Sequence, residues 1–579
     1  MINLQSSRLH TIVIVVVMLL ALGFQLVAIH EQSLSGDGAY HLIAGYQGWR
    51  VGQNRLNLEH PPLVKTIMTF PLLFDEPLLT EPVPVKNILA AIDNIHANAL
   101  LIRRATIRAR YMALIFFVIP FLAGCYYLGR YIAHWPTGII LLCLVAFSFS
   151  VIPTLTILQT DTAVSLGYLL TLLALFRLLK TKSYDSAVVV GIAFGFAVSV
   201  KFSGLLLLPT ILIAVILIKP PARSYWFSVR RLSLIILSAW IVLELSYWAI
   251  NWNYTQEVGR MTIRTYTHGQ AMVVRDQMQG FEPLLLAVES KDPFLAQWIT
   301  GMLGVYTQNS IGVYPVYAFG EVSYWGRYGY FPALFLIRVP LVILLTGLFA
   351  VFYFLKRGKF TGQPPRQKSA EILLLLVTVG AYLWVAVTSN YNLGFRHLIP
   401  IIPIVYLPAA CWLAQHRAVA RVFIGLLMIE ALLLSPLWMN ATNTWWLGEA
   451  NPTRFVFSLE DNFIQLAKYG EQHNIKKLNV IDPGTGEKQI QAYIPDARLL
   501  KWETPLEAGW YAVSVRVEQF VPALLYTPED SALKQVAQQW HPVWQTVKTG
   551  QDFGYAAGSF HIYYLDEGQL IKPGKAQSP

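Results

Sequence analysis

The chain has 579 residues, of which 55% are hydrophobic and 13% are charged, and its formal net charge is +11. Apolar runs of about twenty residues recur through most of the sequence, as they do in polytopic membrane proteins. Because Lys and Arg gather in the cytoplasmic loops of such proteins, the positive charge indicates orientation and is no sign of nucleic-acid binding. All three cysteines fall within apolar runs, so neither disulfides nor thiolate metal sites are expected at Cys125, Cys143 and Cys411.

Eleven apolar segments predict about eleven transmembrane helices. The first is interpreted as a retained helix and not as a signal peptide, because no clear small-residue cleavage site follows it. The segments are residues 11–29, 111–131, 136–153, 162–180, 185–200, 204–218, 232–250, 330–355, 371–389, 397–414 and 420–438.

The charges of the connecting loops predict the orientation. With the N-terminus inside, every predicted inner loop is basic, as the positive-inside rule requires. The odd number of spans then places the polar loops and the C-terminal tail outside. We therefore expect a plasma (inner) membrane protein with a membrane domain over residues 1–439. The basic residues of the inner loops are Arg130, Arg177, Lys180, Lys182, Lys219, Arg223, Arg230, Arg231, Lys356, Arg357, Lys359, Arg366, Lys368, Arg417 and Arg421.

The tail differs from the rest of the chain, because polar residues interrupt short alternating runs. We expect residues 440–579 to form an extracytoplasmic α/β domain, a size sufficient for one small folded unit. The pattern predicts strands at residues 477–481, 510–517 and 555–564 and helices at residues 458–473 and 529–540.

The first outer loop carries acids and histidines that a simple anchor does not need. Residues 40–49 are interpreted as an amphipathic helix along the membrane surface, and residues 61–74 as a segment that dips back into the apolar region. Asp37 is a candidate general base toward an acceptor hydroxyl or, equally, an N-cap of the following helix. The other candidates in this loop, each of which a solvated loop explains about as well, are His41, Glu59 and His60.

Two further candidates lie at the ends of predicted spans on the outer side. Asp161 precedes an apolar span, where it is a site candidate but is more simply explained as a helix cap. Lys201 lies between two spans on the outer side, against the positive-inside trend. An anionic group is therefore expected to compensate the charge of Lys201.

Two arginines also stand where the topology does not favour a cation. Arg396 lies in an outer turn with the further candidates Asn392 and His397, and its guanidinium suits a phosphate. Arg338 falls within a predicted span, where a partner or a lipid phosphate is expected unless the side chain reaches the interface.

Metal and nucleotide sites find no support in the sequence. Asp37, His41, Glu59 and His60 show no regular metal-ligand spacing, so no metal is assigned to the site. A Walker loop, a dinucleotide-binding glycine fingerprint and a nucleophile elbow are absent. Nucleotide-driven chemistry is therefore not expected, no cofactor is assigned, and dependence on a divalent metal is left open.

Several motifs, taken together and in order, resemble a known family. These motifs are Asp37–His41, Arg55–Lys65 with its Glu59-His60-Pro61-Pro62 core, Thr160-Asp161, Lys201–Gly204, Tyr330–Leu341 and Gly394–Pro400, with Leu459–Ala467 and Ala512–Ser514 in the tail. The chain resembles bacterial members of glycosyltransferase family 39. These are dolichyl-phosphate-mannose protein mannosyltransferase-like enzymes with a GT-C fold, related to the aminoarabinose transferase of lipid A.

The resemblance implies an integral-membrane glycosyltransferase. A polyprenyl-phosphate sugar would be the donor, a protein or glycolipid the acceptor, and transfer would invert the configuration at C1. Asp37 matches the acid that serves as the base. The family usually has a second acid directly after it, where this chain has Gly38, so a paired-acid or metal-assisted role is not implied here. The residues that match polar positions near the donor phosphate are Asp161, Lys201 and Arg396, and Arg338 is a further candidate for binding the phosphate or lipid because of its place in a span.

Other functions remain open from the residues alone. A flippase or transporter of lipid-linked sugars should show paired halves and polar residues near the bilayer midplane, whereas these candidates lie at outer span ends. A membrane-tethered binding protein would leave the loop motifs without a purpose. Within the enzyme class, the sugar and the acceptor (a protein hydroxyl, lipid A or another glycolipid, or a glycan) are not decided, and neither is the oligomeric state.

Overall fold

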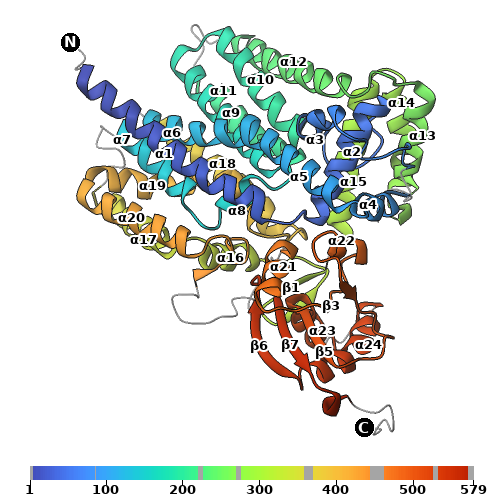
Figure 1. Ribbon diagram of the computed structural model, residues 1–579. Helices are drawn as coiled ribbons and strands as arrows, with labels where there is room; N and C mark the ends of the chain where they lie inside the picture. Colours follow the sequence, from blue (N-terminus) through green and yellow to red (C-terminus); the bar gives the residue numbers. More distant parts are fainter. Residues whose placement is uncertain are drawn as a thin grey trace.

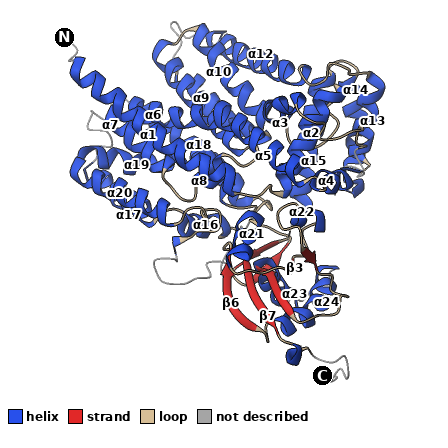
Figure 2. Ribbon diagram, viewed as in Figure 1, coloured by secondary structure: helices blue, strands red, loops and turns tan. Residues whose placement is uncertain are grey.

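The computed structural model describes residues 4–84, 87–218, 226–268, 275–313, 315–357, 369–443, 462–525 and 532–570. Helices make up most of the chain up to residue 443, and a small sheet with helices follows (Figures 1 and 2). The expected combination of an apolar helical membrane protein and a C-terminal α/β domain is confirmed. Several basic residues of the predicted inner loops, and part of one tail motif, lie outside the described residues: Lys219, Arg223, Lys359, Arg366, Lys368 and Leu459–Asp461.

The helices of the membrane part follow one another with short connections. Their bounds are α1 Leu4–Glu31, α2 Gly36–Val51, α3 Pro62–Thr69, α4 Ile88–His96, α5 Ala99–Ala113, α6 Ile119–Ile132, α7 Trp135–Ala146, α8 Ile152–Leu155, α9 Asp161–Thr181, α10 Tyr184–Val200, α11 Leu208–Leu217, α12 Trp226–Trp248, α13 Gln256–Thr267, α14 Glu282–Glu289, α15 Pro293–Ile311, α16 Tyr330–Arg338, α17 Leu341–Arg357, α18 Ser369–Thr388, α19 Ile402–Gln415 and α20 Arg417–Leu433. A short hairpin of β1 (Val316–Ala318) and β2 (Glu321–Ser323) precedes α16.

Each of the eleven predicted apolar segments contains a helix, but not every helix is long enough to cross a membrane. Among the described residues, six helices meet the requirements of length and composition, or seven if one bent pair counts as a single span. The shorter apolar helices are Pro62–Phe74, Trp135–Ala146, Tyr184–Val200 and Phe202–Leu217. Hydropathy alone does not reveal where an apolar run is interrupted, so the predicted count exceeds the number of full-length helices.

The predicted span 330–355 shows such an interruption. It consists of α16 and α17, which meet at an angle of 111°. Pro340 stands at the junction, where proline cannot donate a backbone hydrogen bond and restricts the residue before it. The bend leaves Arg338 at the end of α16 and not in the middle of a continuous helix.

The helix predicted at residues 40–49 is confirmed as α2, but the amphipathic character expected of it is wrong. Residues Gly38 to Gly48, with the sole exception of Tyr40, are buried, so protein covers α2 on both faces. Gly45 explains part of this packing, because a Cβ atom there would lie 2.4 Å from the carbonyl oxygen of Lys65 in α3. The glycine therefore permits an approach of the two helices that the pattern of polar residues did not indicate.

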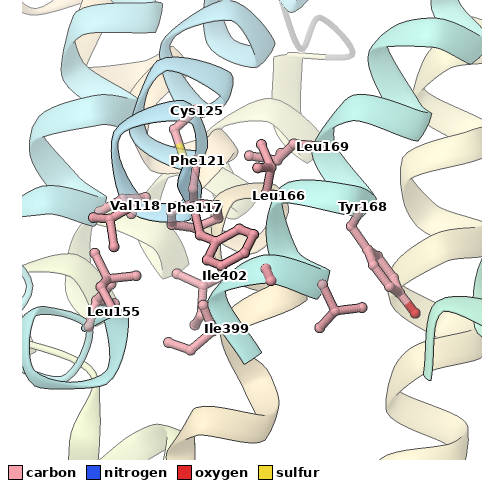
Figure 3. Close-up of a cluster of buried hydrophobic side chains, with 14 of the residues drawn as sticks. Phe117, Val118, Phe121, Cys125, Leu155, Leu166, Tyr168, Leu169, Ile399 and Ile402 are labelled. Carbon is pink, nitrogen blue, oxygen red and sulfur yellow. The ribbon is translucent and has the colours of Figure 1, made fainter. Parts of the chain in front are cut away.

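A rigid apolar core lies where α6, α9 and the turn before α19 meet. Phe117, Phe121, Leu166 and Ile399 belong to this cluster, and all four are nearly or completely buried (Figure 3). Ile399 belongs to the short 3₁₀ helix Phe395–Ile401, which also carries Arg396. The core therefore holds the backbone of the Arg396 turn in place.

The C-terminal part contains a five-stranded sheet in the order β4-β3-β5-β7-β6. Strand β3 is parallel to β4 and β5, whereas β7 is antiparallel to β5 and β6. Figure 1 shows this sheet beside the membrane helices, with α21 and α22 between the two. The bounds are α21 Phe463–Gln472, β3 Leu478–Ile481, α22 Glu487–Gln491, β4 Ala497–Leu499, β5 Gly509–Ser514, α23 Val515–Leu525, α24 Ala532–Val547, β6 Gln551–Ala556 and β7 Phe560–Leu565.

The predictions for the tail are confirmed in part. The strand at residues 477–481 is β3, and the helices at 458–473 and 529–540 correspond to α21 and α24, although residues 458–461 and 529–531 lie outside the described residues. The strand at 510–517 ends at Ser514, where α23 begins. The segment 555–564 is a hairpin and not one strand, because Ala557 and Gly558 take positive φ angles of 58° and 66° in a tight turn.

A charged cluster joins α23 to this hairpin. Nδ1 of His561 lies 2.7 Å from Glu518 Oε1, and its Nε2 lies 2.8 Å from Asp552 Oδ1. The hydroxyl of Tyr563 donates to the same glutamate at 3.2 Å. Burial alone would lower the pKa of His561, but the contacts with Glu518 and then Asp552 outweigh it and raise the pKa above the usual value.

Candidate active site

Asp37 lies in the first turn of α2 but does not cap it. The N-cap is Ser35, whose Oγ accepts a hydrogen bond from the backbone N–H of Gly38 at 3.2 Å. The carboxylate of Asp37 accepts instead from Nη2 of Arg396 at 2.8 Å and from Nε2 of Gln159 at 3.4 Å. The helix-cap interpretation of Asp37 is therefore wrong, because Ser35 occupies the cap position. Both hydrogen bonds of the carboxylate use Oδ2, so Oδ1 is left for a further partner.

This carboxylate borders a cavity of about 270 Å³. The side chain of Asp37 is 54% exposed there, whereas that of Arg396 is 15% exposed. Among the described residues, the charged groups of the lining are one carboxylate and three guanidinium groups, those of Arg338, Arg396 and Arg516. The other lining residues are Leu34, Ser35, Gly36, Thr154, Ile157, Gln159, Pro315, Asn392, Leu393, Phe395, Met439, Phe463 and Gln489.

The cavity has walls from distant parts of the chain. Asp37 comes from α2, Arg338 from α16 and Arg396 from the turn before α19, while Phe463, Gln489 and Arg516 come from the C-terminal part. An excess of guanidinium groups over carboxylates favours an anionic ligand.

The environment of Asp37 keeps its carboxyl group ionised. Partial removal from bulk water would alone raise the pKa of Asp37, but the surrounding positive groups, with the charge and hydrogen bond of Arg396 foremost, together outweigh this effect and hold the pKa below its usual value. At neutral pH the group is therefore a carboxylate, the form that can accept a proton.

Arg338 is a nearly buried cation of the cavity for which the described residues provide no counterion. Its side chain is nearly buried, with 4% of the residue exposed, and Nη1 donates to the carbonyl oxygen of Ala441 at 2.7 Å. Its buried Nε has no hydrogen-bond partner, and no carboxylate of the described residues forms an ion pair with it. A buried cation without a counterion is strongly disfavoured, so a bound anion would stabilise it.

Lys201 and Asp161 form a separate buried pair. Nζ of Lys201 donates to Oδ1 of Asp161 at 2.6 Å, and their side chains are 16% and 6% exposed. The anionic group expected beside Lys201 is therefore Asp161. The N-cap position of α9 belongs to Thr160, so the cap interpretation of Asp161 is wrong as well. Neither Lys201 nor Asp161 is among the residues that line the cavity.

The two candidate histidines, His41 and His60, contact each other and are not among the residues that line the cavity. The ring centroids of His41 and His60 are 4.7 Å apart, and Nδ1 of His60 lies 3.5 Å from Oγ1 of Thr160. Burial lowers the pKa of His41 to about 3 and that of His60 well below its usual value. Both rings are therefore neutral at physiological pH and serve the site, if at all, without a charge of their own.

The remaining candidates have defined partners. Glu59 accepts from Nδ2 of Asn57 at 3.4 Å, and burial raises the pKa of its carboxyl group. Asn392 lines the cavity, and its Nδ2 lies 3.5 Å from the carbonyl oxygen of Arg327. The backbone carbonyl of His397 accepts from the hydroxyl of Tyr382.

The sequence did not indicate two of the polar residues that line the cavity of Asp37, Gln159 and Arg516. Gln159 stands two residues before Asp161, and this proximity to a candidate residue is the one feature of the sequence that pointed to it. Arg516 carried no signal, because its approach to the cavity depends on how the C-terminal part packs. Within the described ranges, no three side chains of His, Cys, Asp or Glu gather so that they could hold a metal ion.

Comparison with known proteins identifies part of the chain. Residues 95–248 match the model of a family described as dolichyl-phosphate-mannose-protein mannosyltransferase. The matched segment contains Asp161 and Lys201, whereas Asp37, Arg338 and Arg396 lie outside it. No curated protein matches the sequence.

Two solved membrane proteins are similar in structure. One is the oligosaccharyltransferase of Archaeoglobus fulgidus in the apo form, with 12% identity, a TM-score of 0.42 and coverage of 90% of this chain and 72% of that one. The other is ArnT from Cupriavidus metallidurans, in the apo state and bound to undecaprenyl phosphate, with 10% identity, a TM-score of 0.32 and coverage of 96% and 99%.

The resemblance expected from the sequence is thus confirmed over residues 95–248, which match the dolichyl-phosphate-mannose-protein mannosyltransferase family model.

Proposed function

We propose that the protein is a GT-C-type glycosyltransferase that moves a sugar from a polyprenyl phosphate to an acceptor on the outer side of the membrane. The observation that carries the proposal is the cavity in which the ionised Asp37 faces Arg338, Arg396 and Arg516. A base beside an anion-binding group is what transfer from a lipid phosphate requires. The relation of residues 95–248 to a family named for a dolichyl-phosphate sugar supports this class of donor.

In the proposed reaction, Asp37 accepts the proton of an acceptor hydroxyl through the oxygen that Arg396 and Gln159 leave available. The acceptor oxygen forms a bond to C1 of the sugar as the bond between C1 and the phosphate oxygen breaks. The electron pair of that bond stays on the polyprenyl phosphate, whose added negative charge Arg338 stabilises. Attack from the face opposite the leaving group inverts the configuration at C1.

The donor phosphate would be stabilised by Arg338, Arg396 and Lys201, which act in different ways. Arg338 and Arg396 line the cavity and would contact the phosphate. Lys201 is neutralised by Asp161 and would act through the local potential, without contact. His41, Glu59, His60 and His397 would support the packing and polarity of the wall behind the base.

The outer orientation is part of the proposal. Residues 1–439 would form the membrane domain, and residues 440–579 would face outside with Asp37. A cysteine introduced near Lys476 should react with a membrane-impermeant thiol reagent in intact cells or spheroplasts. A cysteine near Gly362, which lies outside the described residues, should react only after permeabilisation. The opposite labelling pattern would contradict the orientation.

The function itself is tested with the purified full-length protein. It is incubated with a panel of polyprenyl-phosphate sugars and membrane extracts, and mass analysis identifies the modified acceptor. Release of polyprenyl phosphate together with a glycosylated product supports the proposal. Movement of intact donor across a vesicle membrane without any cleavage would support a transporter instead.

A further inference from the structure

The segment that leads to Asp37 is held by the C-terminal part of the chain. Helix α1 ends at Glu31, and α2 begins at Gly36, one residue before Asp37. The last carbonyl groups of a helix have no partners within it and must find them elsewhere. Here the partners of residues 29–34 come from α5 on one side and, on the other, from α21 with its N-cap residue and from the turn that follows α22.

Arg110 of α5 provides the first set of contacts. It is 2% exposed, and its Nη1 donates to the carbonyl oxygens of Ile29 at 3.0 Å and Gln32 at 2.7 Å. Its Nη2 donates to the carbonyl oxygen of Ser33 at 2.8 Å. One guanidinium group therefore fixes the backbone where α1 ends.

The C-terminal part provides the second set, centred on Glu31. Nδ2 of Asn462 donates to the carbonyl oxygen of Glu31 at 3.1 Å, and Nε2 of Gln465 donates to its Oε2 at 2.6 Å. Lys468 forms an ion pair with the same carboxylate. Side chains of α21 and of Asn462, the N-cap residue of α21, thus bind the last residue of α1.

Two further bonds hold the residues that follow. The backbone N–H of Phe463 donates to Oγ of Ser33 at 3.3 Å, and the backbone N–H of Leu34 donates to the hydroxyl of Tyr493 at 2.9 Å. Leu34 is buried and stands three residues before Asp37. The chain between them contains the N-cap Ser35 and has little freedom to move.

From these contacts we infer that the C-terminal domain positions the base, because it holds residues 31–34 and so the start of α2. The inference rests on the proposed role of Asp37, and it makes Glu31, Lys468 and Tyr493 positioning residues. A single partly exposed ion pair contributes little stability. The combined contacts matter because a small displacement of a reacting group can lower the rate by a large factor.

The test is a charge exchange across this contact in the full-length protein. Lys468→Glu and Glu31→Lys should each lower kcat at least about tenfold, because misplacement of a base affects the chemical step. The apparent KM for the polyprenyl-phosphate sugar should change little, since Arg338 and Arg396 lie on other segments. The double variant Glu31→Lys/Lys468→Glu should recover most of the lost kcat. Lys477→Glu, the same charge change at an exposed lysine of the C-terminal part, is the matched control.

A second readout does not depend on activity. Hydrogen–deuterium exchange of residues 29–40 should be faster in Lys468→Glu than in the wild type and should return toward the wild-type rate in the double variant. If Lys468→Glu does not fold, Tyr493→Phe, which removes the acceptor of the Leu34 N–H, decides by the same two measurements. Wild-type kcat and exchange in the folded single variants, or no recovery in the double variant, would overturn the inference. An active Asp37→Asn variant would instead contradict the proposed base. The exchange measurement would then still test whether the C-terminal domain holds residues 29–40 in place.

Discussion

Replacing Asp37 with asparagine separates the proposed base from its structural role. Asparagine has nearly the same shape and keeps an oxygen that can accept from Nη2 of Arg396, now at 2.8 Å from Asp37. It cannot accept a proton. Loss of a general base lowers the rate by roughly 10²–10⁴-fold. We therefore expect kcat to fall within that range while expression, membrane insertion and melting temperature stay close to those of the wild type.

The same substitution has a second, opposite effect on donor binding. Two unit charges 2.8 Å apart attract by about 1.5 kcal/mol at the dielectric constant of water, which is a lower bound here because the side chain of Arg396 is only 15% exposed. Asp37→Asn removes this attraction, so the guanidinium of Arg396 would attract a phosphate more strongly. The apparent Kd for a polyprenyl phosphate should therefore fall by about tenfold or more.

The assay measures kcat and apparent KM for the polyprenyl-phosphate sugar and, in parallel, binding of undecaprenyl phosphate. Asp185→Asn, at an exposed position in the first turn of α10, is the matched control. Transfer by Asp37→Asn within about tenfold of the wild type would refute the base role. Weaker donor binding would contradict the charge argument even if transfer were lost.

The other predictions concern the charged groups around and beyond the cavity. Arg338→Gln should weaken binding of undecaprenyl phosphate at least about tenfold, since a charge-assisted hydrogen bond contributes about 1.5–3 kcal/mol, and unchanged affinity would rule out its phosphate contact. Lys201→Met should destabilise the protein by about 3–5 kcal/mol because Asp161 is left buried and uncompensated, and the double variant Lys201→Met/Asp161→Asn should recover most of the melting temperature. The pKa of His561 is raised in the folded protein, so protonation of this histidine stabilises the fold. The stabilisation is complete at pH values below the unfolded-state pKa of 6.5, and it is lost as the pH rises through the folded-state pKa. The melting temperature of the wild type should therefore decline with rising pH in that window, whereas that of His561→Gln should be lower in acid and flatter.

The helical membrane class was predictable because hydropathy is a local property of the sequence. Every predicted apolar segment contains a helix, and the polar tail contains the expected sheet. The continuity of the spans was less predictable, as the 111° bend between α16 and α17 shows. In the tail, the reversal at Ala557 and Gly558 was missed because the alternating pattern continues on both sides of a two-residue turn.

The placement of α2 illustrates a different limit. The sequence predicts an amphipathic helix with one face open to the membrane surface, but α3 and other elements cover both faces. Whether one or both faces of a helix are covered depends on which elements pack against it. Small residues such as Gly45, which permit close packing, are the one local sign of this in the sequence. Contacts between distant segments, including that of Arg516 with the cavity, have no local signal at all.

Charge pairing is the step at which sequence analysis names candidate residues but leaves their roles open. Lys201 and Arg396 stood out as cations on the outer side, and Asp161 and Asp37 as acids. In the structure each cation contacts one of these acids, at 2.6 Å and 2.8 Å. A compensated pair attracts an anion less than an isolated cation does, because the two fields largely cancel. Arg338 was singled out only for its position within a span, yet it is the buried cation of the cavity that no described carboxylate compensates. If a phosphate binds here, Arg338 should therefore contribute more to its affinity than Lys201, an order that direct comparison of Arg338→Gln with Lys201→Met/Asp161→Asn in undecaprenyl phosphate binding would test.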